Sequence, residues 1–384
     1  MIASNTLTQR HLTNWLLRRV PLTGIRRVVP LLGALASDIG SVRDTNQDRV
    51  AILRSRDRAG QTFVVAALAD GIGGMRDGAL CASMAIGHLF GKLVQLAQAE
   101  GQIDVWLDRA VNHSNMDVYE HLRGAGGSTL VTILIHESGK VFWSSVGDSR
   151  VYLVSDGRVG QISTDDTIAG QLKKQSAPAH EQSKLLQFIG MGDGLEVHVG
   201  ELNAAKAAQA FLTSDGIHFL AGASDWLSAL IVHSPDVATC ARRLVDVSKW
   251  CGGQDNASVV ALPLDVDFSA DPAPTDPCIE VWDSFGEVRF LVEEISVRDR
   301  PFLASNRADT VAASSSKNEA SSQIEGYNRE QRVEGAIKKK ERTSKASKTK
   351  AKTKVKATSR ERKKDHEAVE GEGQVVLEFH DKPE

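Results

Sequence analysis

Five aspartates of this chain stand next to apolar runs and beside glycine or asparagine, where strands would begin or end. They are Asp48, Asp70, Asp148, Asp215 and Asp255. A single aspartate of this kind is typical of a turn. Five of them between residues 48 and 255 favour one convergent acidic site. Clustered carboxylates repel each other, so such a site needs cations. Oxygen ligands without His or Cys favour Mg²⁺ or Mn²⁺.

Asp70 has the most informative surroundings. It follows the continuous apolar run 63–69, which predicts a buried strand, and it precedes Gly71, Gly73 and Gly74. Glycines allow the backbone to come close to whatever Asp70 holds. A carboxylate at the rim of a core costs free energy unless it is paired or bound to a cation. An Asp-Gly hairpin turn is the structural alternative.

The elements that position these aspartates alternate between strand and helix patterns. Apolar patterns predict strands at 31–39, 50–53, 63–69, 197–202, 210–213 and 257–262, and helices at 77–98 and 105–122. Residues 129–162 contain four short β-branched runs separated by turn residues, which predicts an antiparallel meander. A later helix is expected to start with Ser234 as its N-cap and to end at Trp250.

Composition limits the classes of protein that fit. The chain has 384 residues, 41% of them hydrophobic, and contains no run of about 18 apolar residues, so no membrane span is expected. The N-terminus lacks the pattern of a secretory signal. The four cysteines show no C-x-x-C spacing, which indicates free thiols of a cytosolic protein rather than a zinc site. A cytoplasmic location is therefore predicted.

The formal net charge of −3 hides an uneven distribution. Residues 338–364 hold 14 Lys and Arg against 2 Glu, a net charge of +12, which leaves −15 for the rest of the chain. An acidic body suits cation sites, whereas a basic tail suits nucleic acid, an anionic surface or an acidic partner. The tail lacks interleaved aromatic residues, which argues against stacking on single-stranded nucleic acid.

Changes in composition also predict the domain organisation. The expected parts are a basic N-terminal segment (1–30), a globular domain (31–265), a linker (266–277), a β-hairpin (278–300), a disordered Lys- and Ser-rich segment (301–368) and a terminal strand-like docking segment (369–384). Within the N-terminal segment, residues 8–20 fit a short amphipathic helix.

Six short motifs carry a resemblance to a known family. They are Arg43-x-x-Asn46-Gln47-Asp48, Ala69-Asp70-Gly71-Ile72-Gly73-Gly74, Gly127-Ser128-Thr129, Gly147-Asp148-Ser149-Arg150, Thr213-Ser214-Asp215-Gly216 and Asp255-Asn256. In order and spacing the chain resembles the metal-dependent protein phosphatases of the protein phosphatase 2C family, in particular the bacterial branch, over residues 31–264. The resemblance implies an α+β fold, a four-layer α-β-β-α sandwich of two antiparallel sheets flanked by helices, followed by a largely disordered C-terminal tail.

The resemblance also implies a set of metal ligands. The counterpart of Asp70 bridges two Mn²⁺ or Mg²⁺ ions, and the carbonyl of Gly71 completes one coordination shell. The counterparts of Asp215 and Asp255 hold the other ion. A third, weaker ion is implied at the counterparts of Asp148 and Asp215.

The implied activity is that of a protein serine/threonine phosphatase. The counterpart of Asp48 orients a metal-bound water, and the counterpart of Arg43 grips the substrate phosphate, as a planar bidentate donor should. With Asp70, these two are the predicted catalytic residues. The implied substrate is a phosphoserine or phosphothreonine protein, and the implied partner is a cognate Ser/Thr kinase.

Three departures from the family pattern bear on catalysis rather than on metal binding. Ile72 stands where some eukaryotic relatives place a histidine, so the proton for the leaving group must come from elsewhere. Gln47 replaces the glutamate of many relatives. Asp165-Asp166-Thr167 stands where many carry Asp-His-Ser.

Two alternatives remain at this point. Ser128 could be a nucleophile, although a helix stop that leads into a strand is the favoured interpretation. The whole chain could instead be a phosphatase-like regulatory or scaffold module that docks a kinase or another partner through its C-terminal extension. The presence of Arg43 together with the five aspartates argues against loss of catalysis.

Overall fold

The computed structural model describes residues 7–99, 102–168, 170, 184–202, 208–218, 225–270, 273 and 278–291. The chain divides into two compact units, residues 1–305 and 306–384. The second unit, with the predicted Lys- and Ser-rich segment and the terminal docking segment, lies outside the described residues.

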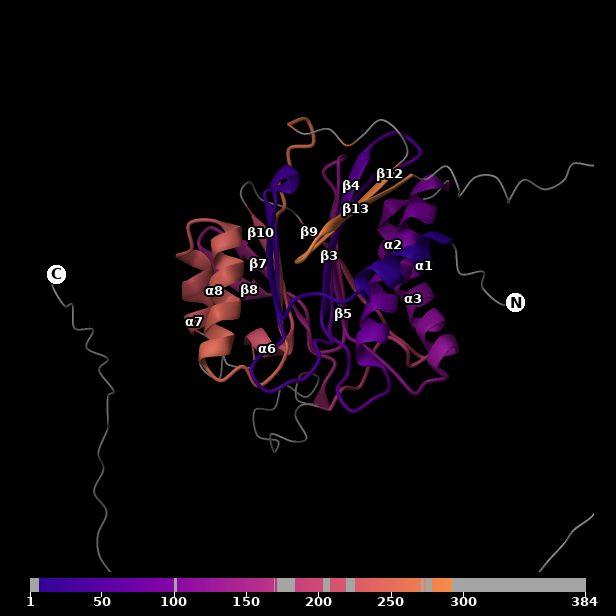
Figure 1. The fold of residues 1–384 in the computed structure, drawn as a ribbon. Coiled ribbons are helices and arrows are strands. Elements are labelled where there is room, and N and C mark those ends of the chain that lie inside the picture. Colours follow the sequence, from indigo (N-terminus) through magenta and orange to yellow (C-terminus); the bar gives the residue numbers. More distant parts are fainter. Residues whose placement is uncertain are drawn as a thin grey trace, which may run out of the picture. The chain divides into compact units, whose positions relative to one another are not determined.

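Two antiparallel sheets form the centre of the first unit (Figure 1). One has the strand order β1 (Thr23–Val28), β2 (Gly33–Asp38), β11 (Ala257–Pro263), β10 (Gln209–Thr213), β7 (Arg150–Ser155), β8 (Arg158–Gln161). The other has the order β13 (Glu287–Leu291), β12 (Cys278–Asp283), β3 (Arg49–Arg56), β4 (Thr62–Ala69), β5 (Leu130–His136), β6 (Val141–Val146), β9 (His198–Leu202).

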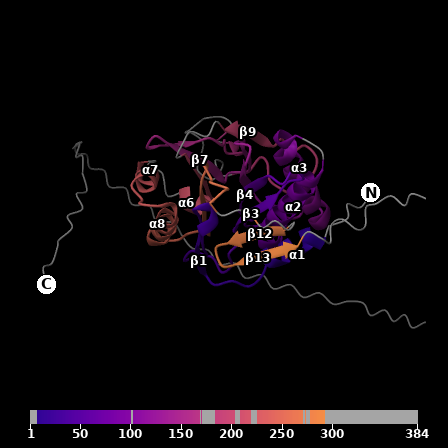
Figure 2. The same ribbon diagram turned by 90° about the horizontal axis from the view of Figure 1, so that it is seen from above.

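Helices cover the outer face of each sheet, as the two views show (Figures 1 and 2). The seven-stranded sheet is covered by α1 (Leu7–Leu16), α2 (Gly78–Gln98) and α3 (Trp106–Leu122), with the short helix η2 (Ile103–Val105). The six-stranded sheet is covered by α6 (Asp215–His218), α7 (Asp225–Val232) and α8 (Val237–Trp250), and η1 (Val29–Leu31) joins β1 to β2. The predicted four-layer α-β-β-α sandwich is confirmed.

Strand β4 shows why an almost wholly apolar run forms a strand here. Its odd-numbered residues from Phe63 to Ala69 pack against the helices, and its even-numbered residues from Val64 to Leu68 pack between the sheets. Side chains of a strand alternate between its two faces, and both faces are covered in this fold. An apolar residue is therefore stabilising at every position up to Asp70.

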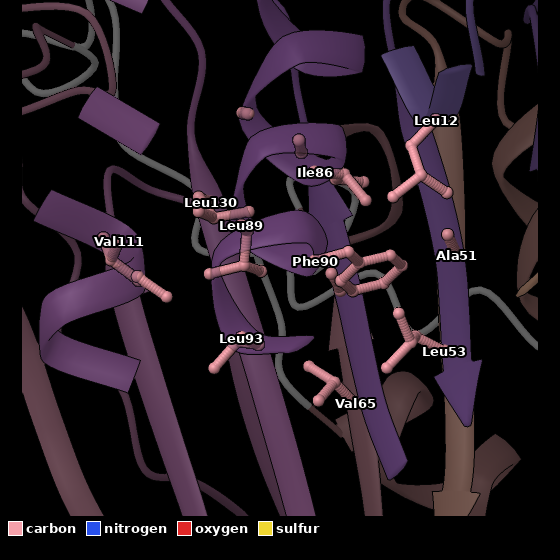
Figure 3. Packing of buried hydrophobic residues seen from close by; sticks show 14 of the residues in the cluster. Leu12, Ala51, Leu53, Val65, Ile86, Leu89, Phe90, Leu93, Val111 and Leu130 are labelled. Atoms are coloured by element: carbon pink, nitrogen blue, oxygen red, sulfur yellow. The ribbon is translucent and has the colours of Figure 1, made fainter. Parts of the chain in front are cut away.

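Helix α2 is apolar for the same reason. Figure 3 shows Phe90 of α2 among Leu12 of α1, Leu53 of β3 and Val65 of β4. Among the described helices, α2 is long and apolar enough to cross a membrane, but 72% of the relevant window is buried inside the protein. Burial between a sheet and two helices accounts for its composition.

The structure corrects the predicted meander over 129–162. Strands β5 and β6 form one hairpin in the seven-stranded sheet, and β7 and β8 form another in the six-stranded sheet. The chain changes sheets between Val146 and Arg150, where Gly147 has φ +96°. Glycine adopts this conformation without the steric cost that other residues incur. The crossing places Asp148 between the sheets rather than in an ordinary hairpin turn.

The N-cap of α8 was also predicted wrongly. Asp236, not Ser234, caps the helix, and its side chain accepts hydrogen bonds from the backbone N–H groups of Ala238 and Thr239. Ser234 Oγ instead donates to Leu230 O at the end of α7. Helix α7 and strand β1 were not predicted from the sequence.

The first compact unit is larger than the predicted 31–265 domain. Helix α1 packs into the core, with Leu12 and Leu16 buried, and β1 pairs with β2 along its whole length. Strand β12 pairs with β3, placing Glu280 opposite Arg54. The predicted N-terminal segment and hairpin are therefore built into this unit.

Candidate active site

A cavity of about 190 Å³ opens where the strands of the two sheets end. Its walls include six of the predicted site residues: Arg43, Asp70, Gly71, Asp148, Asp215 and Asp255. They come from the β2–β3 loop, the end of β4, the β6–β7 crossing, the start of α6 and the residues just before β11. Both sheets therefore contribute carboxylates to one site.

Backbone contacts hold Asp70 in place. Its N–H donates to Thr129 Oγ1 at 3.0 Å, and its carbonyl accepts from Thr129 N and Ser128 Oγ, both at 2.8 Å. Thr129 Oγ1 is itself bonded to Ser149 Oγ at 2.7 Å. Ser128 is fully buried, so its hydroxyl fixes the backbone of Asp70, which agrees with the structural interpretation of that serine.

Gly71 occupies a place that no side chain could share. A Cβ atom added there would lie 2.4 Å from the backbone of Gly78, the first residue of α2. This close approach brings the start of α2 against the loop after Asp70. It explains the need for glycine at this position.

Asp48 lies next to the cavity, buried behind its wall. Ser214 Oγ donates to Asp48 Oδ2 at 2.8 Å, and the Asp48 N–H donates to Asn46 Oδ1 at 3.0 Å. Burial, the largest cause, raises the pKa of Asp48 to about 6, and the nearby charge of Asp255 adds to the rise. This aspartate was expected at the site, and the structure places it adjacent to Asp70.

Burial and neighbouring negative charges also raise the pKa values of the other carboxylates of the site. Burial raises the pKa of Asp215 to about 8, with further contributions from the charges of Asp148 and Asp255. Burial, followed by the charge of Asp165, raises the pKa of Asp148 to about 6. The pKa of Asp70 is raised well above its usual range, first by burial and then by the charge of Asp48. A cation in the cavity would relieve this repulsion.

Two buried oxygens provide a direct test of whether a metal would fit. Asp48 Oδ1 and Asp215 Oδ1 receive no hydrogen bond from any described residue. Both carboxylates lie within hydrogen-bonding reach of the Asp70 carboxyl, which can donate its one proton to only one of them, and to neither once it is ionised. Buried acceptors without donors cost free energy, and a divalent cation would satisfy them. The donor set therefore fits a hard cation.

The carboxylates do not already surround a single point. Within the described ranges, no group of three or more His, Cys, Asp or Glu side chains has the arrangement of a formed metal site. Mg²⁺-type ions commonly take only one or two protein carboxylates and keep several waters. The spacing suits hydrated ions in an open cavity better than a closed protein cage.

Arg43 stands at the rim of this acidic cavity. Its Nη2 donates to Asp255 Oδ2 at 2.6 Å, and 45% of its side chain remains exposed. The bond to Asp255 is the main cause that raises the pKa of Arg43, and the charges of Asp215 and Asp70 act in the same direction. A Cβ at Gly73 would lie 3.2 Å from Arg43 Nη1, so glycine leaves room for the guanidinium.

Asn256 is a site residue that the sequence analysis did not single out. Its Nδ2 donates to Ile39 O at 2.9 Å and to Thr45 O at 3.1 Å, while its Oδ1 accepts from Gln47 N at 2.8 Å. It thus holds both ends of the loop that carries Arg43. Its place beside Asp255 in the last motif was the available signal.

The residues in the Asp-His-Ser position of many relatives brace the Asp148 turn. Arg150 forms a bidentate pair with Asp165, at 3.0 Å from Nε to Oδ1 and 2.7 Å from Nη2 to Oδ2. Asp166 accepts from Gly147 N at 3.0 Å and contacts His198 Nε2 at 2.9 Å. Arg150 therefore pairs with Asp165 and not with the neighbouring Asp148.

Comparisons with known proteins agree with the geometry, although no family model matches the chain. A putative protein phosphatase 2C-type protein of Streptococcus pyogenes is 27% identical over 242 residues, which cover 60% of this chain and 96% of that protein. The chain is similar in sequence to proteins of the protein phosphatase 2C family. The serine/threonine protein phosphatase PstP of Mycobacterium tuberculosis is 30% identical over 260 residues, 64% of this chain and 47% of PstP.

A solved structure of a related protein bears on the metal question. The catalytic domain of the serine/threonine protein phosphatase PstP, solved in complex with two manganese ions, is 27% identical, with a TM-score of 0.51. The alignment covers 63% of this chain and all of that domain. In sequence and in fold, this chain is thus similar to enzymes of the metal-dependent protein phosphatase class.

Proposed function

We propose that this protein is a metal-dependent phosphatase of the protein phosphatase 2C type, which removes phosphate from phosphoserine or phosphothreonine in proteins using two Mn²⁺ or Mg²⁺ ions. The observation that carries the proposal is the convergence of four aspartates and Arg43 on one cavity, beside the unpaired buried oxygens of Asp48 and Asp215. The two manganese ions of the PstP catalytic domain support the same assignment.

The chain's own residues divide the work between metal binding and substrate binding. Asp70 and the Gly71 carbonyl would hold one ion, and Asp70, Asp215 and Asp255 the other. Asp148 with Asp215 would take a third, weaker ion. When bound, the ions lower the pKa of water and offset charge on the phosphoryl group, which favours in-line attack on phosphorus.

Asp48 and Arg43 serve the reacting groups in this proposal. Buried Asp48 accepts a hydrogen bond from Ser214 and would orient the attacking water through its free oxygen. Arg43 would leave Asp255 and present two parallel N–H groups to the phosphate oxygens, since guanidinium geometry matches them. Stabilisation of charge that develops in the transition state is the main catalytic effect expected.

The proton for the departing serine or threonine oxygen needs another source. None of the described residues that line the cavity is a histidine, and Ile72 lines it with an apolar side chain. Gln47 also lines the cavity and could hold a water there. Solvent is therefore the proposed donor.

The decisive experiment is phosphopeptide hydrolysis with and without Mn²⁺. We expect activity that requires Mn²⁺, is abolished by a chelator, and is lost in Asp70→Ala and Asp215→Ala. Asp193→Ala is the matched control, because Asp193 is an exposed aspartate before a glycine and lies outside the cavity. Activity that survives the chelator, or that survives both cavity substitutions, would rule out the proposal.

A partner and a location are also part of the proposal. A cognate Ser/Thr kinase would supply the phosphorylated substrate, and a cytoplasmic location suits four cysteines that form no disulfide. Part of the C-terminal extension in the scaffold alternative, strand β12, pairs with β3 in the seven-stranded sheet, and β13 forms the edge of that sheet. An acidic partner or nucleic acid for the basic segment 338–364 stays a prediction, since that segment lies outside the described residues.

A further inference from the structure

Arg49, the first residue of β3, ties the loop that carries Asp48 to two helices. Its Nε donates to Leu16 O of α1 at 2.8 Å and to Ser83 Oγ of α2 at 3.1 Å. Its Nη1 donates to Asn46 O at 3.0 Å and to Asp48 O at 2.6 Å. One guanidinium therefore connects the end of α1 to the backbone on either side of Gln47.

The end of α1 is in turn fixed to strand β12. Arg18, two residues beyond α1, forms a bidentate pair with Asp283, at 2.7 Å from Nη1 to Oδ2 and 2.9 Å from Nη2 to Oδ1. The Arg18 guanidinium also lies over the ring of Trp15, 4.1 Å from its centre. The Asp283 side chain is only 7% exposed and that of Arg18 is 28% exposed, so solvent screens this pair less than a fully exposed one.

Helix α2 is shaped to receive α1. A Cβ atom at Gly91 would lie 2.4 Å from Gln9 Cγ, and one at Gly87 would lie 2.6 Å from Thr13 Oγ1. These two glycines are one helical turn apart, as are Gln9 and Thr13. The surface of α2 that contacts α1 is thus closely packed against it.

These contacts converge directly behind Asp48. A second, narrow cavity is lined by Leu16, Asp48, Arg49, Asp283 and Phe285, among others. In the ladder between β12 and β3, Asp283 lies opposite Ala51, two residues from Arg49. We call α1 together with Arg18, Asp283 and Arg49 the α1–β12 clamp. Through Arg49, the clamp connects the wall of the active site to α1 and Arg18, which precede region 31–264, and to Asp283, which follows it.

We propose that Arg49 is a positioning residue for Asp48, and that the α1–β12 clamp keeps it in place. The catalytic half of this inference rests on the proposed function, because it assumes that Asp48 acts in the reaction. The structural half does not. Loss of the clamp would free the loop from Asn46 to Asp48, so Asp48 would spend less time where water and metal require it. Misplacing a reacting group by a small distance is enough to slow catalysis strongly.

The test uses Arg49→Met and Arg18→Met in the full-length protein. Arg56→Met is the matched control, because Arg56 ends the same strand and also donates to carbonyl groups, those of Gly60 and Ala273. Arg49→Lys is the conservative variant, which keeps the charge but not the planar fork. The measurements are hydrogen exchange of the Gln47 and Asp48 amides in metal-free protein, Mn²⁺ affinity by calorimetry, and kcat and KM on a phosphopeptide.

We expect the Gln47 and Asp48 amides to exchange at least about tenfold faster in Arg49→Met, with about a 10–100-fold loss of kcat or Mn²⁺ affinity, the range for residues that support metal ligands. KM should change little, and Arg49→Lys should restore part of the loss. Arg18→Met should show the same pattern more weakly, and Arg56→Met should show none of it.

Unchanged amide exchange in both Arg49→Met and Arg18→Met would overturn the proposal. If Arg49→Met does not fold, Arg18→Met decides, because the Arg18 side chain is partly exposed and Asp283 still accepts hydrogen bonds from the backbone N–H groups of Phe285 and Gly286. If the wild type shows no Mn²⁺-dependent hydrolysis, the proposed function fails, while the exchange measurement still decides the clamp. Faster exchange with kcat and Mn²⁺ affinity both unchanged would confine Arg49 to a structural role and overturn its assignment as a positioning residue.

Discussion

Arg43 Nη2 donates to Asp255 Oδ2 at 2.6 Å, so an expected phosphate-binding residue is bonded to an expected metal ligand. The guanidinium occupies an oxygen that a metal would use. We therefore expect metal binding at Asp255 and release of Arg43 toward the phosphate to be linked. The cavity would become ready for substrate as the ions enter it.

This relationship predicts opposite effects of Arg43→Met on metal and on substrate. Removing the guanidinium frees Asp255 Oδ2 and takes a positive charge from the cavity rim, so Mn²⁺ affinity should stay the same or increase. KM for a phosphopeptide should rise about 10–100-fold, since a hydrogen bond to a charged group contributes about 1.5–3 kcal/mol. Calorimetry and steady-state kinetics measure the two effects separately.

Arg76→Met is the control for that experiment, because Arg76 is 71% exposed and pairs with Asp77 outside the cavity. A weaker Mn²⁺ affinity in Arg43→Met, with KM unchanged, would contradict the assignment of Arg43 to the phosphate.

The raised pKa of Asp215 predicts how stability depends on pH without metal. Its folded pKa is about 8 against a usual 3.8, so the folded state binds the proton more tightly than the unfolded state between those values. Stability should fall as the pH rises through this window, by on the order of a few kcal/mol at most. Thermal unfolding in EDTA from pH 5 to 8 should show a falling Tm, with a smaller fall in Asp215→Asn.

Excess Mn²⁺ at pH 7 should raise the Tm of the wild type more than that of Asp215→Asn. The wild type should gain Tm because a ligand that binds only the folded state stabilises it, and Asp215→Asn should gain much less. Asp193→Asn should behave like the wild type throughout. Equal pH profiles for wild type and Asp215→Asn would show that Asp215 is not destabilised by its surroundings.

Asn256→Ala should separate the support of the loop from metal binding. The substitution removes hydrogen bonds to Ile39 O, Thr45 O and Gln47 N. At about 0.5–1.5 kcal/mol each, the loss should be roughly 2–4 kcal/mol in the free energy of unfolding, together with a loss of kcat. Urea unfolding measures the first effect and phosphopeptide hydrolysis the second.

Asn112→Ala is a suitable comparison, because Asn112 is part-exposed and bonds only to Asp108 one turn earlier in α3. It should cost well under half as much stability and leave kcat unchanged. Matching losses in the two variants would argue against a special role of Asn256 in the loop.

Ile72→His should reveal how much the missing proton donor limits turnover. Ile72 lines the cavity, so a histidine there could protonate the leaving oxygen. General acid catalysis contributes about 10²–10⁴-fold where geometry is good, and an unoptimised histidine should give a smaller increase in kcat on a phosphoserine peptide. An aryl phosphate, whose leaving group departs as a stable anion, should show no increase.

Ile72→Gln controls for polarity without acid catalysis. Equal increases on the peptide and the aryl phosphate would point to better binding rather than proton donation. No increase on either substrate would mean that proton transfer does not limit the rate.

The aspartates could be found from sequence because each one interrupts or borders an apolar run. Asp70 is the clearest case, since the two covered faces of β4 require apolar residues up to Ala69. A polar residue next to such a strand has to be justified by function. The number of such aspartates predicted that they converge. The structure brings four of them to one cavity and places the fifth, Asp48, behind its wall.

Pairings between strands that are distant in the chain could not be predicted from the sequence. Nothing in the local pattern of residues 278–291 states that β12 pairs with β3, more than two hundred residues earlier. The change of sheet at Gly147 was missed because four β-branched runs with tight turns look the same whether or not they share a sheet. The sequence predicts Ser234 as the N-cap because Pro235 resembles a first helical residue, whereas the observed bonds start the helix after Asp236.

The pairing of β12 with β3 has a consequence for folding of the chain during its synthesis. Chains are synthesised from the N-terminus, and β3 leaves the ribosome long before Asp283 does. Until then one edge of β3 has no partner, and Arg18 has no Asp283 to bind. A nascent chain that already holds all five aspartates would thus still lack the support behind Asp48. Full activity would arise only once the last strands of the folded unit have been made.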